Sequence, residues 1–336
     1  MKIAVCGIGV AGSYLISRIK DSHEVVGFER MSEDKHDSIC AWGASKPKMV
    51  EFCKKSGLDF EDYVLHDGKN LHIEMDKNVK FDIGLHGLCT YDKIQLIKDF
   101  IKGCNVNFGK APKLEDLEKE FDLIVDCTGF HRVYLPRLKE DFFLPTYEYM
   151  VQYDDKVPYD DFLVRPFAKM TGYFWYFPLG KNIAYIGAGD YKKNHVKATD
   201  EFLAKHGGKV LKTVGRPIRL ATPDWCKPFY KGKVVGVGES IGTVYPLLGE
   251  GIIPSMECVD IFIKNLGDNE AYEKEVLEHF KIYGKVFKFI RNKMKNQFSI
   301  IKQLPDLLSI FRYMKKNEAR FGMEVHMKDL MRVAKA

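Results

Sequence analysis

Several features that mark other protein classes are missing from this 336-residue chain. It has no run of about 18 or more apolar residues, which excludes a bilayer-spanning helix. It has no repeat period and no low-complexity tract, which excludes solenoid and fibrous architectures. The opening MKIAVCGIGVAGS lacks a cleavage-type ending, which argues against a signal peptide. A formal net charge of +6 is mild and gives no indication of nucleic-acid binding. We therefore expect a globular protein of one to three domains.

The eight cysteines follow no functional pattern, because none forms a CxxC pair or lies at metal-ligand spacing from a histidine. We therefore expect neither a disulfide framework nor a metal ion. Buried, reduced thiols are typical of a reducing compartment, so we expect a cytoplasmic protein.

The amino-terminal segment has the pattern of a dinucleotide-binding unit. The apolar run KIAVC predicts a buried parallel strand, and a complete GxGxxG follows it and precedes a helical pattern. Gly7 makes the tight turn, Gly9 lets backbone N–H groups approach a pyrophosphate, and Gly12 allows the helix to pack closely on the strand. A second short strand ends on Glu29, which would accept hydrogen bonds from the ribose and repel the 2′-phosphate of NADP.

Two later segments favour FAD over NAD as the dinucleotide. DLIVDCTGF predicts a strand and then a turn at Gly129, of the kind that lies near the cofactor in many flavoproteins. A second strand ends at Gly238 and Glu239, where two-nucleotide flavoproteins usually carry Gly-Asp and the acid binds the ribityl chain. The loop GEGI then leads into a helix that begins near Gly251. Its backbone N–H groups would meet the pyrimidine edge of the flavin and stabilise the anionic reduced form.

These segments resemble the FAD-dependent family of para-hydroxybenzoate hydroxylase type, and within it the geranylgeranyl reductase family most closely. The resemblance covers about residues 1–260 and is carried by GIGVAG with Glu29-Arg30, Cys40 to Gly43, Tyr91-Asp92, Asp126 to Gly129, Tyr173 to Pro178, Ala188-Gly189 and Pro246 to Ile252. It implies FAD as the cofactor. It also implies cofactor contacts at Gly7, Gly9, Ala11, Gly12, Glu29, Arg30, Cys40, Ala41, Gly43, Gly129, Gly238, Glu239, Gly249, Gly251 and Ile252.

The fold class that we expect is α/β, with a Rossmann-like FAD-binding domain, an inserted antiparallel β-sheet substrate domain and a helical C-terminal region. The FAD-binding domain is discontinuous and takes residues 1–60, 86–136 and 228–265. The substrate domain takes residues 61–85 and 137–227, and the helical region takes residues 266–336. Five segments supply strands of the insertion: PTYEYMVQY, FLVRPF, YFWYFP, NIAYIGAG and GKVLKTV.

The aromatic stretch GYFWYFPLG predicts one strand with two aromatic faces, because alternate residues of a strand share a face. The resemblance implies that one face lines a cavity for an isoprenoid chain. The predicted substrate contacts are therefore Tyr173, Trp175, Phe177 and Pro178. A doubly buried strand inside a sandwich core is the alternative.

The basic tail interleaves Phe, Ile, Leu and Met with Lys and Arg at helical spacing over residues 284–321. Such helices lie on anionic membrane surfaces, so we expect peripheral contact with the inner face of the membrane. A solvated helical subdomain is the alternative. The predicted function is FAD-dependent reduction of isoprenoid C=C bonds on a prenylated lipid or prenyl diphosphate, with ferredoxin or NADPH as the electron donor.

Cys40 is the candidate catalytic residue, because the resemblance places it in a loop beside the isoalloxazine ring. A thiol there would donate a proton or pack against the ring. The family usually reads Pro-Cys-Gly at this position, whereas this chain reads Ile-Cys-Ala-Trp-Gly. The extra Trp42 would stack on the flavin or block its face. Two further departures are Leu88, where the family has an arginine that contacts the cofactor, and Glu239 in place of aspartate.

Three other functions stay open. A flavin monooxygenase of the hydroxylase type shares the fold but usually has a compact polar pocket. A flavin-dependent halogenase carries a Trp-x-Trp-x-Ile-Pro block, which Tyr173 and Phe177 match poorly. A lipid-binding protein, with or without flavin, would perform no turnover, and a preparation that stayed colourless with added FAD would favour it.

Overall fold

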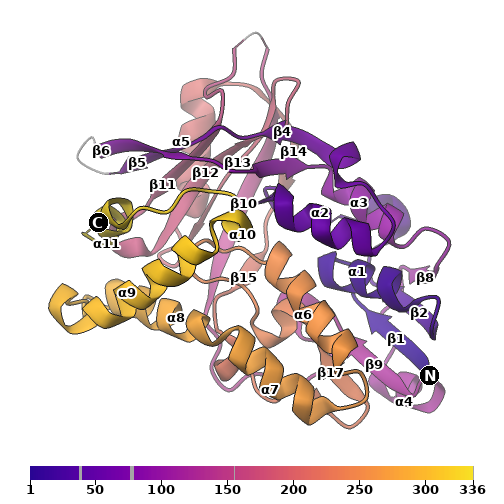
Figure 1. The fold of residues 1–336 in the computed structure, drawn as a ribbon. Coiled ribbons are helices and arrows are strands. Elements are labelled where there is room, and N and C mark those ends of the chain that lie inside the picture. The colour runs from indigo at the N-terminus through magenta and orange to yellow at the C-terminus, as the bar shows by residue number, and fades with distance from the viewer. Residues whose placement is uncertain (38–39, 76–78, 155, 336) are drawn as a thin grey trace.

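The computed structural model describes residues 1–37, 40–75, 79–154 and 156–335. Its first sheet has the strand order β16-β17-β9-β1-β2-β8 and is parallel apart from the edge strand β16. The strands are β1 (Lys2–Cys6), β2 (Glu24–Glu29), β8 (Asn105–Phe108), β9 (Leu123–Asp126), β16 (Tyr230–Lys231) and β17 (Val234–Gly236). Because β1 lies between β2 and β9, the turn that follows it opens at the carboxyl edge of three parallel strands (Figure 1).

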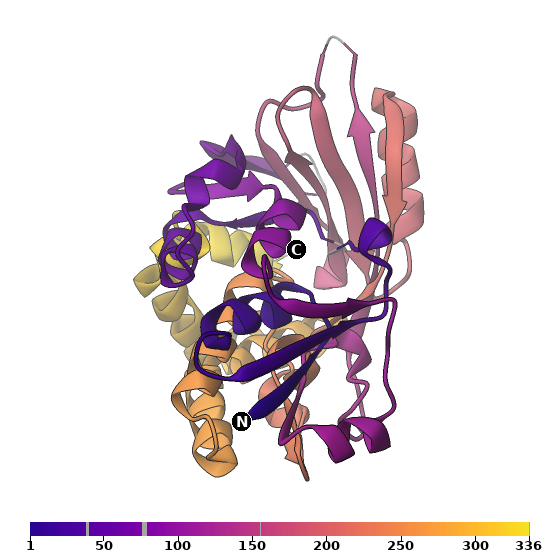
Figure 2. The same cartoon turned by 90° about the vertical axis from the view of Figure 1, so that its right-hand side faces the viewer.

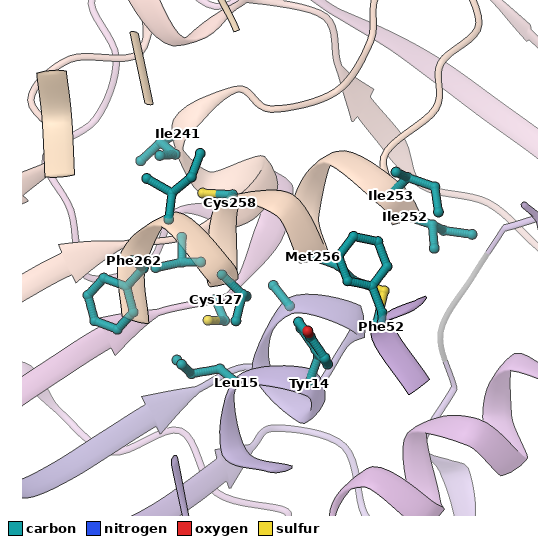
Figure 3. Close-up of a cluster of buried hydrophobic side chains, with 14 of the residues drawn as sticks. Tyr14, Leu15, Phe52, Cys127, Ile241, Ile252, Ile253, Met256, Cys258 and Phe262 are labelled. Carbon is teal, nitrogen blue, oxygen red and sulfur yellow. The ribbon is translucent and has the colours of Figure 1, made fainter. Parts of the chain in front are cut away.

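Two helices far apart in the sequence cover this sheet together. Helix α1 (Val10–Ile19) follows the glycine turn, and α6 (Ile252–Lys264) packs beside it. Figure 3 shows their contact, where Tyr14 and Leu15 of α1 meet Met256 and Cys258 of α6. The long apolar run of α6 therefore folds back onto the first unit of the chain.

The second sheet has the order β14-β10-β13-β12-β11-β5-β6, and the short strand β15 pairs with β10. It is antiparallel except for one parallel pair, β5 with β11. Helix α5 (His195–His206) lies along one face (Figure 2). The strands are β5 (Asn70–Met75), β6 (Val79–Gly84), β10 (Phe143–Gln152), β11 (Phe162–Pro166), β12 (Gly172–Pro178), β13 (Ile183–Asp190), β14 (Lys209–Val214) and β15 (Pro217–Arg219).

A small third sheet is ordered β3-β7-β4, and its strands alternate along the chain with strands of the two larger sheets. Its strands are β3 (Gly43–Ser45), β4 (Val64–Asp67) and β7 (Leu88–Tyr91). The helices near it are α2 (Lys46–Lys55), α3 (Lys93–Phe100) and α4 (Leu114–Glu120). Asp92 caps α3, since its carboxylate accepts from the N–H of Gln95 at 2.9 Å.

The C-terminal region is helical, as the sequence predicts. It contains α7 (Asn269–His279), α8 (Lys281–Met294), α9 (Ile300–Lys316), α10 (Glu318–Phe321) and α11 (Met327–Lys335). Helices α8 and α9 pack on each other, and α8 buries most of its apolar residues, whereas α9 buries Leu307, Ile310 and Met314. Within the described residues, no helix combines the length and the apolar character that crossing a membrane requires.

The predicted fold class is confirmed, since the chain has a parallel Rossmann-like sheet, an inserted and largely antiparallel sheet, and a helical C-terminal region. Each of the five segments predicted as strands of the insertion forms a strand. The period-2 and period-3.6 patterns identify these elements because each buries one face.

Candidate active site

The glycine turn after β1 has the close contacts that a dinucleotide turn requires. Gly7 adopts φ +91°, and a Cβ there would lie 2.6 Å from the carbonyl oxygen of Cys127. A Cβ at Gly12 would lie 2.0 Å from the carbonyl oxygen of Gly7. A Cβ at Gly9, by contrast, would have nothing within 4 Å. Close packing therefore requires glycine at positions 7 and 12. Gly9 leaves open space at the N-terminus of α1, where an anion is favoured.

The acid at the end of β2 faces this turn. One carboxylate oxygen of Glu29 accepts from the N–H of Ile8 at 3.0 Å, and the other accepts from the N–H of Met31 at 3.0 Å. Glu29 is buried at 9% exposure, whereas the next residue, Arg30, is exposed. The structure thus holds Glu29 beside the glycine turn and leaves Arg30 at the surface.

A late segment of the chain returns to the same turn. A Cβ at Gly238 would lie 3.1 Å from the Cβ of Ala11 and 3.2 Å from the hydroxyl of Ser255 on α6. A Cβ at Gly129 would lie 3.2 Å from a carboxylate oxygen of Glu239. Residues near positions 11, 129 and 239 therefore meet at one edge of the first sheet.

The GEGI loop joins this edge to the aromatic strand. The hydroxyl of Tyr173 donates to the carbonyl of Leu248 and would lie 3.2 Å from a Cβ at Gly249. Gly251 is the N-cap residue of α6, and Ile252 is its first residue. The glycine turn, the late loop and the aromatic strand thus lie around one region, although they are far apart in the sequence.

Two arginines bind the carboxylate of Glu239, the group that the sequence predicts to bind the ribityl chain. One oxygen of Glu239 accepts from the backbone N–H of Arg219 at 3.0 Å, and the other forms an ion pair with Arg216. The negative charge of Glu239 raises the pKa of the Arg216 guanidinium. Sequence reasoning missed both arginines, since the strand pairing that brings β15 to this edge has no local signal.

A buried cation on α3, the ammonium of Lys93, contacts the Cys40 loop, and nothing in the sequence reasoning identified it. The ammonium of Lys93 donates to the Cys40 sulfur at 2.7 Å, and the N–H of Trp42 donates to it at 3.2 Å. Lys93 is only 2% exposed. A signal was present, because Lys93 shares the inward stripe of α3 with Leu96 and Phe100.

The rest of this loop packs on the second sheet. Trp42 has φ +61°, which is unusual for a bulky residue, and its ring makes an edge contact with Tyr185 at 5.2 Å between centroids. Ala41 packs against the same cluster. A Cβ at Gly43 would lie 2.5 Å from the ring of Phe177, so Gly43 allows the loop to approach β12 closely.

The aromatic strand has the two faces that the sequence predicts. Phe174 and Tyr176 enter a core cluster with Phe202 of α5. Trp175 and Phe177 face the other way. Phe177 packs against Gly43 of the Cys40 loop, and Trp175 packs against Gly187 of β13. Pro178 ends the strand, and its carbonyl accepts from the hydroxyl of Thr90 at 2.5 Å.

A row of residues crosses the second sheet on this inner face. Trp175 of β12 pairs with Gly187 of β13, which pairs with Glu148 of β10. A Cβ at Gly187 would lie 2.5 Å from Glu148 and 2.7 Å from the Trp175 indole. Gly189 lies two residues further along β13, on the same face, so the side chains of β10 and β12 close over a row of glycines.

Residues 107–300, more than half of the chain, match the family model of tryptophan halogenase. The chain belongs to the tryptophan halogenase family. From the sequence, the halogenase block looks a poor match at Tyr173 and Phe177. The matched segment contains residues 173–178, so the family match holds although Tyr173 and Phe177 depart from the Trp-x-Trp-x-Ile-Pro block.

One curated relative matches nearly the whole chain, and several solved structures share its fold. An uncharacterized protein of Methanocaldococcus jannaschii is 28% identical, over 92% of this chain and 96% of its own length. A geranylgeranyl bacteriochlorophyll reductase-like protein from Thermoplasma acidophilum has a TM-score of 0.74 at 15% identity and covers 99% of this chain and 95% of its own.

Two further structures extend the comparison. A tryptophan 6-halogenase from Streptomyces toxytricini has a TM-score of 0.67 at 16% identity, covering 99% of this chain and 89% of its own. A probable FAD-dependent monooxygenase from Pseudomonas aeruginosa has a TM-score of 0.63 at 12% identity, covering 88% and 96%. FAD is the cofactor of this halogenase family and of the flavoproteins that share the fold, as predicted from the sequence. The geranylgeranyl reductase resemblance holds at the level of the FAD-dependent flavoprotein fold.

The residues present fit FAD. The open space at Gly9 and the fixed carboxylate of Glu29 suit the adenosine diphosphate half. The N-terminus of α6 suits the flavin end, since its first N–H groups lack a side-chain cap. The Arg216–Glu239 pair lies between these two ends, beside Gly129.

Proposed function

We propose that this halogenase-family protein is an FAD-dependent oxidoreductase that reduces isoprenoid C=C bonds on a prenylated lipid or prenyl diphosphate. The observation that carries the proposal is the inner face of β12. There the Trp175 indole packs over Gly187, and the Phe177 ring packs against Gly43 of the Cys40 loop. Tyr173 of the same strand donates to the carbonyl of Leu248, so this aromatic face lies beside the GEGI loop.

A polyprenyl chain is long, thin and without polar handles. Its binding depends on buried apolar area, which contributes about 25 cal/mol per Å². A compact polar substrate would instead require several convergent hydrogen-bonding groups.

Bound FAD, once reduced, would supply hydride, and the protein would supply position, exclusion of water and a proton. The predicted catalytic residue Cys40 holds its sulfur as the acceptor of hydrogen bonds from Lys93 and from the backbone of Trp42. This arrangement fixes the loop against α3. It supports a positioning role for Cys40 more directly than proton donation.

The test begins with a visible spectrum of the purified protein with added FAD. The flavin is then photoreduced without oxygen and mixed with a geranylgeranyl lipid or geranylgeranyl diphosphate. We expect the lipid to reoxidise the flavin, with a product two hydrogens heavier for each bond reduced. A reduced flavin that neither prenyl compound reoxidises would contradict the proposal. Substituting ferredoxin or NADPH for light identifies the electron donor.

Halogenation is the second candidate, because the family model matches residues 107–300. Tyr173 and Phe177 stand where the halogenase block has Trp and Ile, which weighs against the same substrate. Turnover in air with bromide and an aromatic substrate separates the two candidates. A brominated product that requires oxygen would favour the halogenase, and reduction that proceeds without oxygen would favour the reductase.

A further inference from the structure

Glu148 lies on β10, the second strand from one edge of the second sheet, and on the sheet's inner face. It faces Trp175 across Gly187, and a side chain at Gly187 would collide with both residues. The sheet therefore presents a carboxyl group directly beside the aromatic wall. Its neighbours on the same strand, Tyr147 and Tyr149, point to the opposite face and contact each other.

The Glu148 carboxyl is buried, and the residue is only 2% exposed. The indole N–H of Trp175 lies close enough to lower the carboxyl pKa as a donor. Neither carboxyl oxygen has a hydrogen bond of good geometry among the described residues. Buried polar groups are normally paired, because an unpaired one costs about 1–3 kcal/mol or more. Trp175 offers one donor to two carboxyl oxygens, so at least one oxygen is left for a ligand group to complete.

The cations near Glu148 are engaged elsewhere. Lys93 donates to Cys40. Lys212 pairs with Asp37, and Arg216 pairs with Glu239. The charged and titratable groups that face Glu148 are Asp37, Lys93, Tyr185, Lys212 and Arg216.

A carboxyl in this environment is most stable as the neutral acid. Burial raises the pKa of Glu148 to about 7, although the positive charge of Lys93 lowers it in part. A group of this kind is half protonated near neutral pH and suits general acid catalysis.

We infer that Glu148 is the proton donor in the reduction of the C=C bond, an inference that rests on the proposed function. The π bond of the alkene breaks, and two C–H bonds form. One carbon receives hydride from reduced flavin, which is oxidised by two electrons, and the neighbouring carbon receives the proton of the Glu148 carboxyl. Glu148 is left as a carboxylate and regains its proton from water, while ferredoxin or NADPH restores the two electrons.

The decisive variant is Glu148→Gln, which keeps shape and polarity but has no acidic proton. Tyr149→Phe is the matched control, because Tyr149 lies on the same strand and the opposite face. In single turnover without oxygen, we expect Glu148→Gln to slow flavin reoxidation by geranylgeranyl diphosphate at least about 100-fold. FAD affinity and reoxidation by oxygen should be unchanged in both variants. The wild-type rate should fall as the pH rises through about 7, because the acid form is then lost.

An infrared titration gives a reading that does not depend on turnover. The wild-type protein should show a protonated-carboxyl C=O band that disappears near pH 7, and Glu148→Gln should lack it. Alkene reduction by Glu148→Gln at the wild-type rate would overturn the assignment while leaving the proposed function intact. So would the absence of the infrared band. A wild-type protein that reduces no prenyl compound would overturn both, even with the band present.

Discussion

Gly9 and Gly12 lie in one turn, yet a side chain at each would meet different surroundings. A Cβ at Gly12 would collide with the carbonyl oxygen of Gly7, 2.0 Å away, and a Cβ at Gly9 would point into open space. Gly12 therefore serves the packing of α1 on β1. Gly9 has an ordinary φ of −82°, so its own backbone does not require glycine. The missing side chain instead leaves room for a ligand above the turn.

We expect Gly9→Ala to keep the apoprotein within about 1 kcal/mol of the wild-type stability. It should weaken FAD binding at least about tenfold, because the added methyl fills the place of the pyrophosphate. Gly12→Ala should instead destabilise the fold itself, by roughly 1–3 kcal/mol. Urea unfolding of the apoproteins and titration with FAD measure the two effects. Wild-type FAD affinity in Gly9→Ala would place the dinucleotide elsewhere.

At the residue scale, the sequence predicts what depends on local conformation. The glycines and Glu29 could be identified because a tight turn, a helix start and a strand end follow one another within a short segment. Glu148 and Arg216 could not, because each acquires its role from strand pairing with residues far along the chain. Lys93 is intermediate, since its place on the apolar stripe of α3 is visible in the sequence but its partner Cys40 is not.

At the scale of elements, the periodic patterns predict the strands of the insertion correctly, and they do not predict the pairing of β5 with β11. The attachment of α10 to the GEGI loop is equally non-local. Arg320 donates to Glu250 at 2.7 Å and to the hydroxyl of Tyr283 at 3.0 Å, and its side chain is 6% exposed. The C-terminal region thus fixes the loop that leads into α6.

We expect Arg320→Leu to destabilise the protein by roughly 3 kcal/mol or more, because it leaves Glu250 buried without its cation. FAD affinity should fall as well, since the GEGI loop loses its attachment. Adding Glu250→Gln should restore part of the stability, because Glu250 then carries no charge, while Glu257, the second carboxylate partner of Arg320, keeps His279 at 3.4 Å. The free energies of unfolding in urea of the wild type, the two single variants and the double variant form a double-mutant cycle. Additive effects would show that the pair does not couple the region to the loop.

At the scale of the whole molecule, packing changes the interpretation of the basic tail. Most of the apolar stripe of α8 is buried in the packing of the helical region, whereas α9 buries only Leu307, Ile310 and Met314 of its apolar residues. Two apolar side chains of α9 stay at the surface, Ile301 at 88% and Leu304 at 43% exposure. The exposed Lys302 lies between them. These two are the exposed large apolar side chains of the helical region among the described residues, so we propose that any contact of this region with a membrane begins at the start of α9.

We expect the protein to sediment with vesicles that contain phosphatidylserine, and less so with neutral vesicles or at high salt. Replacing Ile301 and Leu304 together by serine should reduce the bound fraction several-fold, because the inserted apolar area is lost. Val133→Ser is a suitable control, since Val133 is 58% exposed and lies far from α9 in the sequence. Equal sedimentation of the double variant and the control would mean that α9 is only a solvated edge of the helical region. A prenylated lipid would then have to leave the bilayer before it reaches the aromatic wall of β12.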